Sequence, residues 1–323
     1  MLRTFTAQDV HASLGYERLV PALREAFRRN DAEKPLRAVH QVVSGETPAH
    51  LLTMPAWREG DSIGVKLVTV FPGNSARGLS AVSSVYVLFD GVTGVPRAII
   101  DGEALTNRRT AAASALASTY LSRPDAATLL VVGTGNLARH LAQAHAAVRP
   151  IASVLVWGRN AERARAMSAQ LRGKGLNAEP VSDLAAATAR ADIVSCATIS
   201  RHPLVRGADL RPGTHVDLVG AFTPDMRETD DAAVLRASVF VDTYVGAFAE
   251  AGDLLQAVRA GWSTSLTCAD LHELTAGLKP GRQSADEITL FKSVGTALED
   301  LAAATLLLDA SQPAPGGKAA SAE

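Results

Sequence analysis

One stretch of the chain constrains its fold more than any other, the run of residues 128–148. Residues 128–132 are apolar or suited to a strand, the sequence GTGNLA follows at once, and residues 139–148 are Ala-rich with apolar side chains at helical spacing. A buried strand, a glycine turn and a helix in direct succession are typical of a dinucleotide-binding site. A chance glycine pair at a strand end is the alternative, but the helix and a further strand in phase argue against it.

The residues of this turn have separate roles in such a site. Gly133 permits the tight turn, Gly135 lets the backbone approach a pyrophosphate, and the small Ala138 allows the helix to pack closely on the strand. The amide groups at the helix start receive the anion. We therefore expect the cofactor to be bound by Gly133, Thr134, Gly135, Asn136, Leu137 and Ala138.

The end of the next strand bears on the choice of cofactor. Residues 153–157 predict a strand that ends in Gly158, Arg159 and Asn160. NAD-specific sites carry an acidic residue here for the ribose hydroxyls, whereas Gly and Arg suit a 2′-phosphate. We expect NADPH as the cofactor, with Arg159 and Asn160 among its ligands. The alternative is that Arg159 only caps a loop and NADH is used as well.

The hydrophobic pattern predicts an α/β protein with two domains. Strands are expected at 36–43, 50–56, 63–71, 80–89 and 96–101, without helices between them, which indicates a mainly antiparallel sheet. Later strands, at 128–133, 153–157, 192–197, 214–219 and 239–243, alternate with helices and indicate a Rossmann-type sheet. We expect an α+β domain over 1–121, completed by 288–310 through a last helix at 288–308, a Rossmann NAD(P)-binding domain over 122–287 and a flexible tail over 311–323.

Composition narrows the possible partners. The 323 residues carry 32 basic and 33 acidic side chains, a net charge of -1, without long like-charge blocks. No nucleic-acid or membrane surface is therefore expected, and small molecules and other copies of the chain are the expected partners. The start of the chain lacks a signal-peptide apolar region, which predicts a cytoplasmic protein. Cys196 and Cys268 are expected to be buried free thiols, and the eight scattered His suggest no metal site.

Lys66 is the first of three cations that could bind an anion. It lies in the expected strand 63–71, where alternation places it on the same face as Val68 and Val70, and the strand is apolar on both faces. A cation in such a strand needs an anionic partner. The alternative is a lysine at the sheet edge that reaches water.

Arg109 and Arg37 are the other two cations that could bind an anion. The stripe of Leu105, Ala112 and Leu116 places Arg109 on the inward face of its helix, where a guanidinium could hold a carboxylate bidentately. A structural ion pair with an Asp or Glu elsewhere is the alternative. Arg37 by itself is more typical of a solvated surface residue.

Five ordered motifs together resemble the ornithine cyclodeaminase/mu-crystallin family: PLRAVH with Arg37, GVKLVTVFPGN with Lys66, NRRTAAASALA with Arg109, GTGNLA, and EITLFKSVGTALEDLAAA. The resemblance covers nearly the whole chain. It implies a substrate-binding domain that forms a homodimer, an NAD(P) domain, and a substrate carboxylate held by Arg37, Lys66 and Arg109. It also implies that Ser293 and Val294 lie near the nicotinamide; the alternative is that they begin the last helix.

One residue departs from the family pattern. Ornithine cyclodeaminases and the related alanine dehydrogenases carry an Asp at the position that is Phe222 here, and in the family that Asp handles the amine and the proton transfers. A phenyl ring can do neither, so cyclodeamination of ornithine is disfavoured. Asp225 could substitute, but after Thr223 and Pro224 it is expected in the first turn of a helix.

The run from Gly220 to Glu228 is similar to bacterial members that reduce Δ1-pyrroline-2-carboxylate to proline and Δ1-piperideine-2-carboxylate to pipecolate. The resemblance therefore implies reduction of a cyclic imino acid, with Phe222 contacting the ring. The alternatives are an ornithine cyclodeaminase, an amino-acid dehydrogenase or reductase of acyclic imines, and a non-catalytic ligand-binding protein like mu-crystallin.

Overall fold

The computed structural model describes residues 2–35, 37–42 and 48–311. Within them the chain forms two compact units. The first takes in the residues up to Gly15, Ala32–Leu105 and those from Asp300 on; the second takes in Tyr16–Asp31 and Thr106–Glu299. These units group residues 16–31 and most of the helix that follows Asp101 with the dinucleotide-binding sheet, whereas the expected domain ranges follow the order of elements along the chain.

The first unit is built on a six-stranded sheet in the order β1-β6-β5-β4-β3-β2. Its strands are β1 (Arg3–Phe5), β2 (Ala38–Val42), β3 (Ala49–Arg58), β4 (Ser62–Val70), β5 (Val82–Asp90) and β6 (Pro96–Asp101). The expected antiparallel sheet is confirmed for β2 to β6, and β1 adds a parallel edge strand too short to be recognised from its pattern. Leu36 and Val43, the ends of the first expected strand, lie outside the described residues, as does the tail over 312–323.

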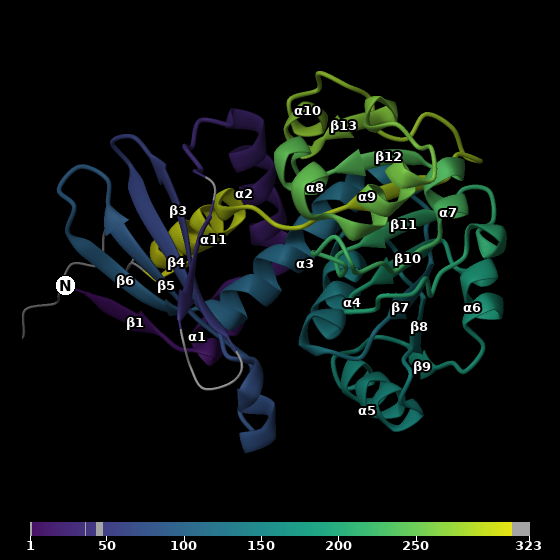
Figure 1. Ribbon diagram of the computed structural model, residues 1–323, viewed down its shortest axis with the longest axis horizontal. Helices are drawn as coiled ribbons and strands as arrows, with labels where there is room; N and C mark the ends of the chain where they lie inside the picture. Colours follow the sequence, from purple (N-terminus) through teal and green to yellow (C-terminus); the bar gives the residue numbers. More distant parts are fainter. Residues whose placement is uncertain (1, 36, 43–47, 312–323) are drawn as a thin grey trace, which may run out of the picture. The chain divides into compact units, whose positions relative to one another are not determined.

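The two faces of this sheet differ in burial. Along β4, Ser62, Gly64 and Lys66 are buried, whereas Ile63 and Val65 are partly exposed. Helix α11 (Ala297–Ala310) supplies Asp300 to the buried face, and α1 (Ala7–Ser13), whose N-cap is Thr6, also belongs to this unit. Figure 1 shows α11 in yellow alongside the strands. The opposite face keeps apolar side chains that the unit itself does not cover fully.

The second unit contains an eight-stranded sheet in the order β13-β12-β14-β11-β10-β7-β8-β9. Every pairing in it is parallel, as the alternation of strands and helices predicts. Its strands are β7 (Thr128–Val132), β8 (Ser153–Trp157), β9 (Ala178–Pro180), β10 (Ile193–Cys196), β11 (His215–Leu218), β12 (Ser238–Val241), β13 (Thr267–Asp270) and β14 (Thr289–Lys292).

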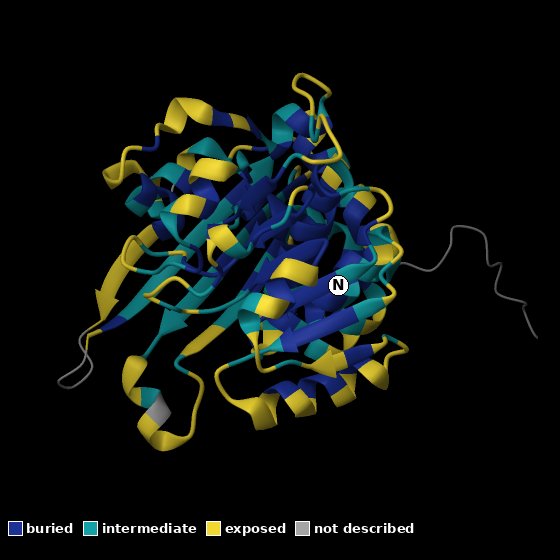
Figure 2. Ribbon diagram, turned by 90° about the vertical axis from the view of Figure 1, so that its right-hand side faces the viewer, coloured by how far each residue is buried: buried dark blue, intermediate teal, exposed yellow. Residues whose placement is uncertain are grey.

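Helices cover both faces of this parallel sheet, so its strands are apolar on both sides. In β7, Leu129 and Val131 face α4 (Asn136–Val148) and α5 (Ala161–Arg172), whereas Leu130 and Val132 face the layer made by α6 (Leu184–Arg190), α7 (Asp231–Arg236), α8 (Tyr244–Glu250) and α9 (Gly252–Arg259). Figure 2 shows the strands of this sheet in the dark blue of buried residues, with exposed yellow stretches on the helices. The remaining helices of the unit are α2 (Tyr16–Arg29), α10 (Leu271–Thr275) and the part of α3 (Gly102–Leu121) from Thr106 on.

No helix of the described chain is long and apolar enough to cross a lipid bilayer.

Two expectations about this part of the chain are wrong. The sequence pattern predicts the last helix over 288–308, but residues 289–292 form β14, which pairs with β11 and β12, and the helix starts only at Ala297. A short apolar run is compatible with a buried strand and with a buried helix, and the segments that pack beside it in the fold determine which one forms. Cys268 is exposed rather than buried, whereas Cys196 is buried as expected.

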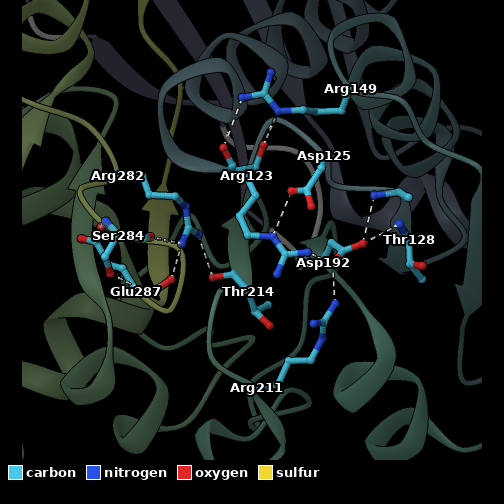
Figure 3. Close-up of polar contacts among 12 residues, drawn as sticks. Arg123, Asp125, Thr128, Arg149, Asp192, Arg211, Thr214, Arg282, Ser284 and Glu287 are labelled. Carbon is cyan, nitrogen blue, oxygen red and sulfur yellow. Dashed lines mark hydrogen bonds and ion pairs between the residues drawn. The ribbon is translucent and has the colours of Figure 1, made fainter.

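Asp192 lies at the amino ends of strands of the parallel sheet and interacts there with several residues. It immediately precedes β10, and its Oδ2 accepts hydrogen bonds of 2.9 Å from the amides of Ala127 and Thr128. Its Oδ1 pairs with Arg123 at 2.8 Å and with Arg211. Figure 3 shows the carboxylate between the two guanidinium groups. This cluster lies at the edge of the sheet opposite the carboxyl ends of the strands.

Replacing Asp192 by asparagine should lower the free energy of unfolding at pH 7 by about 3 kcal/mol, because two arginines lose a nearly buried counter-charge. Burial by itself raises the pKa of Asp192, but the amide hydrogen bonds and the two arginines outweigh it and hold the pKa below its usual value. A carboxylate with a lowered pKa stabilises the fold above about pH 4, and this contribution is lost as the pH falls through the folded-state pKa. Urea unfolding of the wild type and of Asp192→Asn between pH 7 and pH 3 measures the difference in their free energies of unfolding. A difference that does not become smaller at low pH would contradict this role of the Asp192 carboxylate.

Candidate active site

The glycine turn after β7 has the geometry that its sequence predicts. Gly133 adopts φ of 127° and donates its amide to the carbonyl oxygen of Trp157 at 2.9 Å. A Cβ atom on Gly133 would lie 2.6 Å from the carbonyl oxygen of Ala197, so no larger residue fits. Helix α4 begins at Asn136 with Gly135 as its N-cap, and no side chain caps this end. The helix start therefore suits an anion.

A crevice of about 600 Å³ opens at the carboxyl ends of β7, β8 and β10. In a parallel sheet, dinucleotides bind where the strand order reverses, and β7 lies between β8 and β10 at such a point. The crevice is lined by residues at or after the carboxyl ends of the three strands: Gly133, Thr134, Gly135, Trp157, Gly158, Arg159, Asn160, Arg163, Ala197, Thr198, Ile199, Ser200 and Leu204.

The charge of this lining is positive at the end of β8. Arg159 and Arg163 line the crevice, and among the residues that the structure describes no acidic side chain lines it. Asn160 caps α5, because its side chain accepts a hydrogen bond of 3.0 Å from the amide of Arg163. This cap places the first turn of α5 beside the crevice, with Arg163 as a second cation that the sequence reasoning did not single out.

A second cavity, of about 270 Å³, shares Ala197, Thr198 and Ile199 with the crevice. It brings together four residues expected at the site, Arg109, Phe222, Ser293 and Val294, with Leu137 of the glycine turn. The other lining residues are Thr106, Thr110, Val219, Gly220 and Gly295. Apart from the guanidinium, the wall is mostly apolar, as a small carboxylate-bearing ring would need.

Arg109 is the buried cation of this cavity. It projects from α3, is only 5% exposed, and places Nη1 2.6 Å from Oε2 of Glu299. The expected alternative, a structural ion pair, is therefore present, yet the same guanidinium also lines the cavity. Since a guanidinium carries five N–H groups, it can hold a protein carboxylate and a ligand carboxylate together. Gly295, at φ of 83°, leaves room for it, because a Cβ atom there would overlap Nη1.

Lys66 and Arg37 belong to the first unit. Lys66 lies in β4, between β3 and β5, is 4% exposed, and pairs with Asp300, with Nζ 3.3 Å from Oδ1. The anionic partner expected for Lys66 is thus present, and a lysine at the sheet edge that reaches water is ruled out. Arg37 precedes β2 and is partly exposed.

The loop after β11 places Phe222 in the cavity wall. Ala221 has φ of 45°, and the phenyl ring that follows is 46% exposed. Asp225 lies in a turn, not in a helix as expected, where it accepts a hydrogen bond of 2.6 Å from Thr223 and pairs with Arg201. Because the cavity lining does not include Asp225, it does not replace the missing family Asp there.

Sequence reasoning missed the buried acids that hold the loops of the cavity. Asp242, at 0% exposure, accepts the amides of Val294 at 2.9 Å and Gly295 at 2.7 Å. Burial raises the pKa of Asp242, against the effect of these amide bonds. Its only signal in the sequence is an acid that follows an apolar strand directly. Glu228, Asp253 and Lys292 form a second buried group.

A parallel sheet with a glycine turn where its strand order reverses, and beside it a cavity with one buried guanidinium, define a class of protein, the NAD(P)-dependent oxidoreductases. Within this class the chain belongs to the ornithine cyclodeaminase/mu-crystallin family, whose model matches residues 3–313. The resemblance noted in the sequence is thereby confirmed.

Known relatives and solved structures are similar to this chain over nearly its full length. The chain is 40% identical to a Δ1-pyrroline-2-carboxylate reductase of Paracoccus denitrificans, over 93% of this chain and 94% of that protein. The structure of the Thermococcus litoralis Δ1-pyrroline-2-carboxylate reductase in complex with NADH and L-proline matches with a TM-score of 0.89 at 33% identity, covering 95% of this chain and 97% of that one. The iminosuccinate reductase of Paracoccus denitrificans in complex with NAD+ matches with a TM-score of 0.85 at 27% identity, covering 95% of both chains.

Proposed function

We propose that this protein is an NAD(P)H-dependent reductase of cyclic imino acids, which converts Δ1-pyrroline-2-carboxylate to L-proline and Δ1-piperideine-2-carboxylate to L-pipecolate. The observation that carries the proposal is the cavity that shares Ala197, Thr198 and Ile199 with the dinucleotide crevice and has Arg109 in a mostly apolar wall. Such a cavity can orient a carboxylate while leaving a C=N bond beside the nicotinamide.

The reaction adds a hydride to the imine carbon, and the C=N electron pair moves to the protonated nitrogen, giving a secondary amine. A bound NADPH supplies that hydride from C4 of its nicotinamide. Arg109 binds the substrate carboxylate, with Arg37 and Lys66 as further ligands, and Lys66 helps to keep the imine nitrogen protonated. Ser293 and Val294 flank the nicotinamide. In the reductive direction a protonated imine needs no general base, which accounts for a site without the family Asp.

NADPH is the preferred cofactor in this proposal. Gly158 and Arg159 stand where an acid would bind the ribose of NADH, and Arg163 adds a second positive charge to the same crevice. The turn from Gly133 to Ala138 binds the pyrophosphate, with Asn160 at the adenosine end.

We also propose a homodimer formed through the partly exposed face of the first-unit sheet. Three pairs of apolar residues lie side by side on that face of β4 and β5: Ile63 with Phe89, Val65 with Val87, and Leu67 with Val85. A second copy of the chain would cover this face. Light scattering of the purified protein should give twice the mass of the chain, and a monomer at micromolar concentration would contradict the dimer.

The experiment that tests the activity follows NADPH and NADH oxidation by the purified protein with Δ1-pyrroline-2-carboxylate, in parallel with ammonia release from L-ornithine and NAD+. Rapid oxidation with the cyclic imine, without added amine and faster with NADPH, supports the proposal. Turnover that requires ammonia or methylamine would identify a reductase of acyclic imines instead. Ammonia from ornithine would identify a cyclodeaminase, and binding without any hydride transfer would identify a non-catalytic protein.

Phe222 should set the preference for imine over ornithine. Replacing it by alanine should lower kcat/KM for the cyclic imine about tenfold, the equivalent of roughly 1.4 kcal/mol of lost apolar contact with the ring. Replacing it by aspartate should lower imine reduction further and raise the ratio of ornithine deamination to imine reduction, because a carboxylate can pair with an ammonium and take a proton. If both variants keep the wild-type ratio of the two activities, this role of Phe222 is wrong.

A further inference from the structure

A buried group of two acids and one lysine lies directly behind the walls of both cavities. Glu228, Asp253 and Lys292 are each 0% exposed. Lys292 is the last residue of β14, Asp253 lies in the first turn of α9, and Glu228 follows the Phe222 loop. Lys292 Nζ lies 3.2 Å from Asp253 Oδ2, and Asp253 Oδ1 accepts the Glu228 amide at 2.7 Å. The group thus joins three segments that are far apart in the sequence.

Two contacts link this group to the residues that line the cavities. Glu228 Oε1 accepts hydrogen bonds from the Thr198 amide at 2.6 Å and from the Thr198 hydroxyl at 2.8 Å. Lys292 Nζ donates to the carbonyl oxygen of Gly220. Thr198 lines both the crevice and the smaller cavity, and Gly220 lines the smaller one.

The segments that contain Gly220, Thr198 and Glu228 pack closely at this point. A Cβ atom on Gly220 would overlap both Glu228 Oε1 and the carbonyl oxygen of Thr198. The two loops are therefore in direct contact, and the carboxylate of Glu228 occupies the space next to that contact. Removing the carboxylate would free Thr198 in the wall that the two cavities share.

We infer that Glu228 is a positioning residue, which holds Thr198 at the boundary between the crevice and the smaller cavity, so that the nicotinamide and the imine are aligned for direct hydride transfer beside Thr198. Asp253 and Lys292 hold Glu228 and the Gly220 loop in turn. The part of this inference that concerns the imine rests on the proposed function. The part that concerns the cofactor does not, because Thr198 also lines the dinucleotide crevice.

The charge of Glu228 responds to pH in this environment. Among the described residues, the ionisable groups that interact with it include Lys292 from β14, Asp253 from α9 and Cys196 from β10. Burial raises the pKa of Glu228 to about 7, although the charge of Lys292 opposes the rise. An ionised carboxylate is a stronger acceptor than a protonated one. The hold on Thr198 should therefore strengthen, and cofactor affinity should increase, as the pH rises through 7.

The test compares the full-length wild type with Glu228→Gln, Thr198→Val and the double variant. Cofactor dissociation constants are measured by NADPH fluorescence from pH 6 to pH 8.5, and kcat and KM for the imine over the same range. Asp192→Asn is the matched control, since Asp192 also accepts two amides and pairs with a cation but lies at the opposite edge of the sheet. Thr198→Val removes only a hydroxyl, so it remains informative if Glu228→Gln folds poorly.

We expect NADPH affinity of the wild type to rise severalfold between pH 6 and pH 8, and this rise to be absent in Glu228→Gln and retained in the control. Glu228→Gln should lower kcat by about tenfold at pH 8, and the double variant should be no worse than the more impaired single variant. A pH-dependent rise in affinity that persists in Glu228→Gln, or effects of the two substitutions that simply add, would overturn the inference. If cofactor binding behaves as expected but no imine is reduced, the proposed function fails while the positioning role for the cofactor stands.

Discussion

Replacing Arg109 by methionine should lower kcat/KM for Δ1-pyrroline-2-carboxylate by about 1,000-fold. The guanidinium is 5% exposed and is the cation in the lining of the smaller cavity, so a carboxylate bound there loses a desolvated charge partner. Losing one partner of a buried, hydrogen-bonded charge pair costs about 2–5 kcal/mol, and about 4 kcal/mol corresponds to a factor of 1,000. Steady-state kinetics with saturating NADPH measure the loss, and the dissociation constant of NADPH should stay within about threefold of wild type.

The ion pair of Arg109 with Glu299 requires a control for stability. Methionine at position 109 removes the cation that pairs with a carboxylate of 0% exposure, and the fold itself should weaken. The double variant Arg109→Met with Glu299→Gln removes both charges, and should recover thermal stability but not activity. The neighbouring Arg108→Met is the matched control, because the Arg108 guanidinium lies over the Tyr16 ring, 4.8 Å from its centroid, and does not line the cavity. A double variant that is stable and retains activity within tenfold of wild type would show that Arg109 is only structural.

Replacing Gly133 by alanine should weaken NADPH binding by about 100-fold. An alanine at φ of 127° is strained, and its Cβ would lie 2.6 Å from the carbonyl oxygen of Ala197, so the turn must move. Backbone strain of this kind costs about 1–3 kcal/mol, and about 2.7 kcal/mol corresponds to a factor of 100. Fluorescence titration with NADPH measures the effect directly and does not depend on the identity of the substrate.

Gly175 supplies the control for backbone strain alone. It also has a positive φ, of 85°, but nothing lies within 4 Å of the position its Cβ would take, and it follows α5 on the exposed surface. Gly175→Ala should cost some stability through its backbone conformation and leave NADPH affinity unchanged. Equal losses of affinity in the two variants would mean that a general loss of stability, not the shape of the turn, explains the result for Gly133.

Structural elements that depend on residues close together in the sequence could be predicted from the sequence. The strand before Gly133, the glycine turn and helix α4 follow from a pattern of apolar residues and a few turn residues. The antiparallel strands β2 to β6 and the parallel strands from β7 on follow in the same way, because the presence or absence of helices between strands distinguishes the two kinds of sheet. Arg109 could be assigned to the inward face of its helix from spacing alone.

What surrounds each charge was decided only by the tertiary structure. Lys66 pairs with Asp300, 234 residues away, and Arg109 with Glu299, 190 residues away. Asp242 has only a weak sequence signal, its position directly after an apolar strand, and Glu228 has none, because the partners of both acids are backbone amides and side chains brought together by the fold. Strand β14 was missed for the same reason: four apolar and polar residues become a strand only because β11 and β12 leave a place between them. Periodicity records which side of an element faces the core, whereas contacts between distant segments depend on the packing of the whole chain.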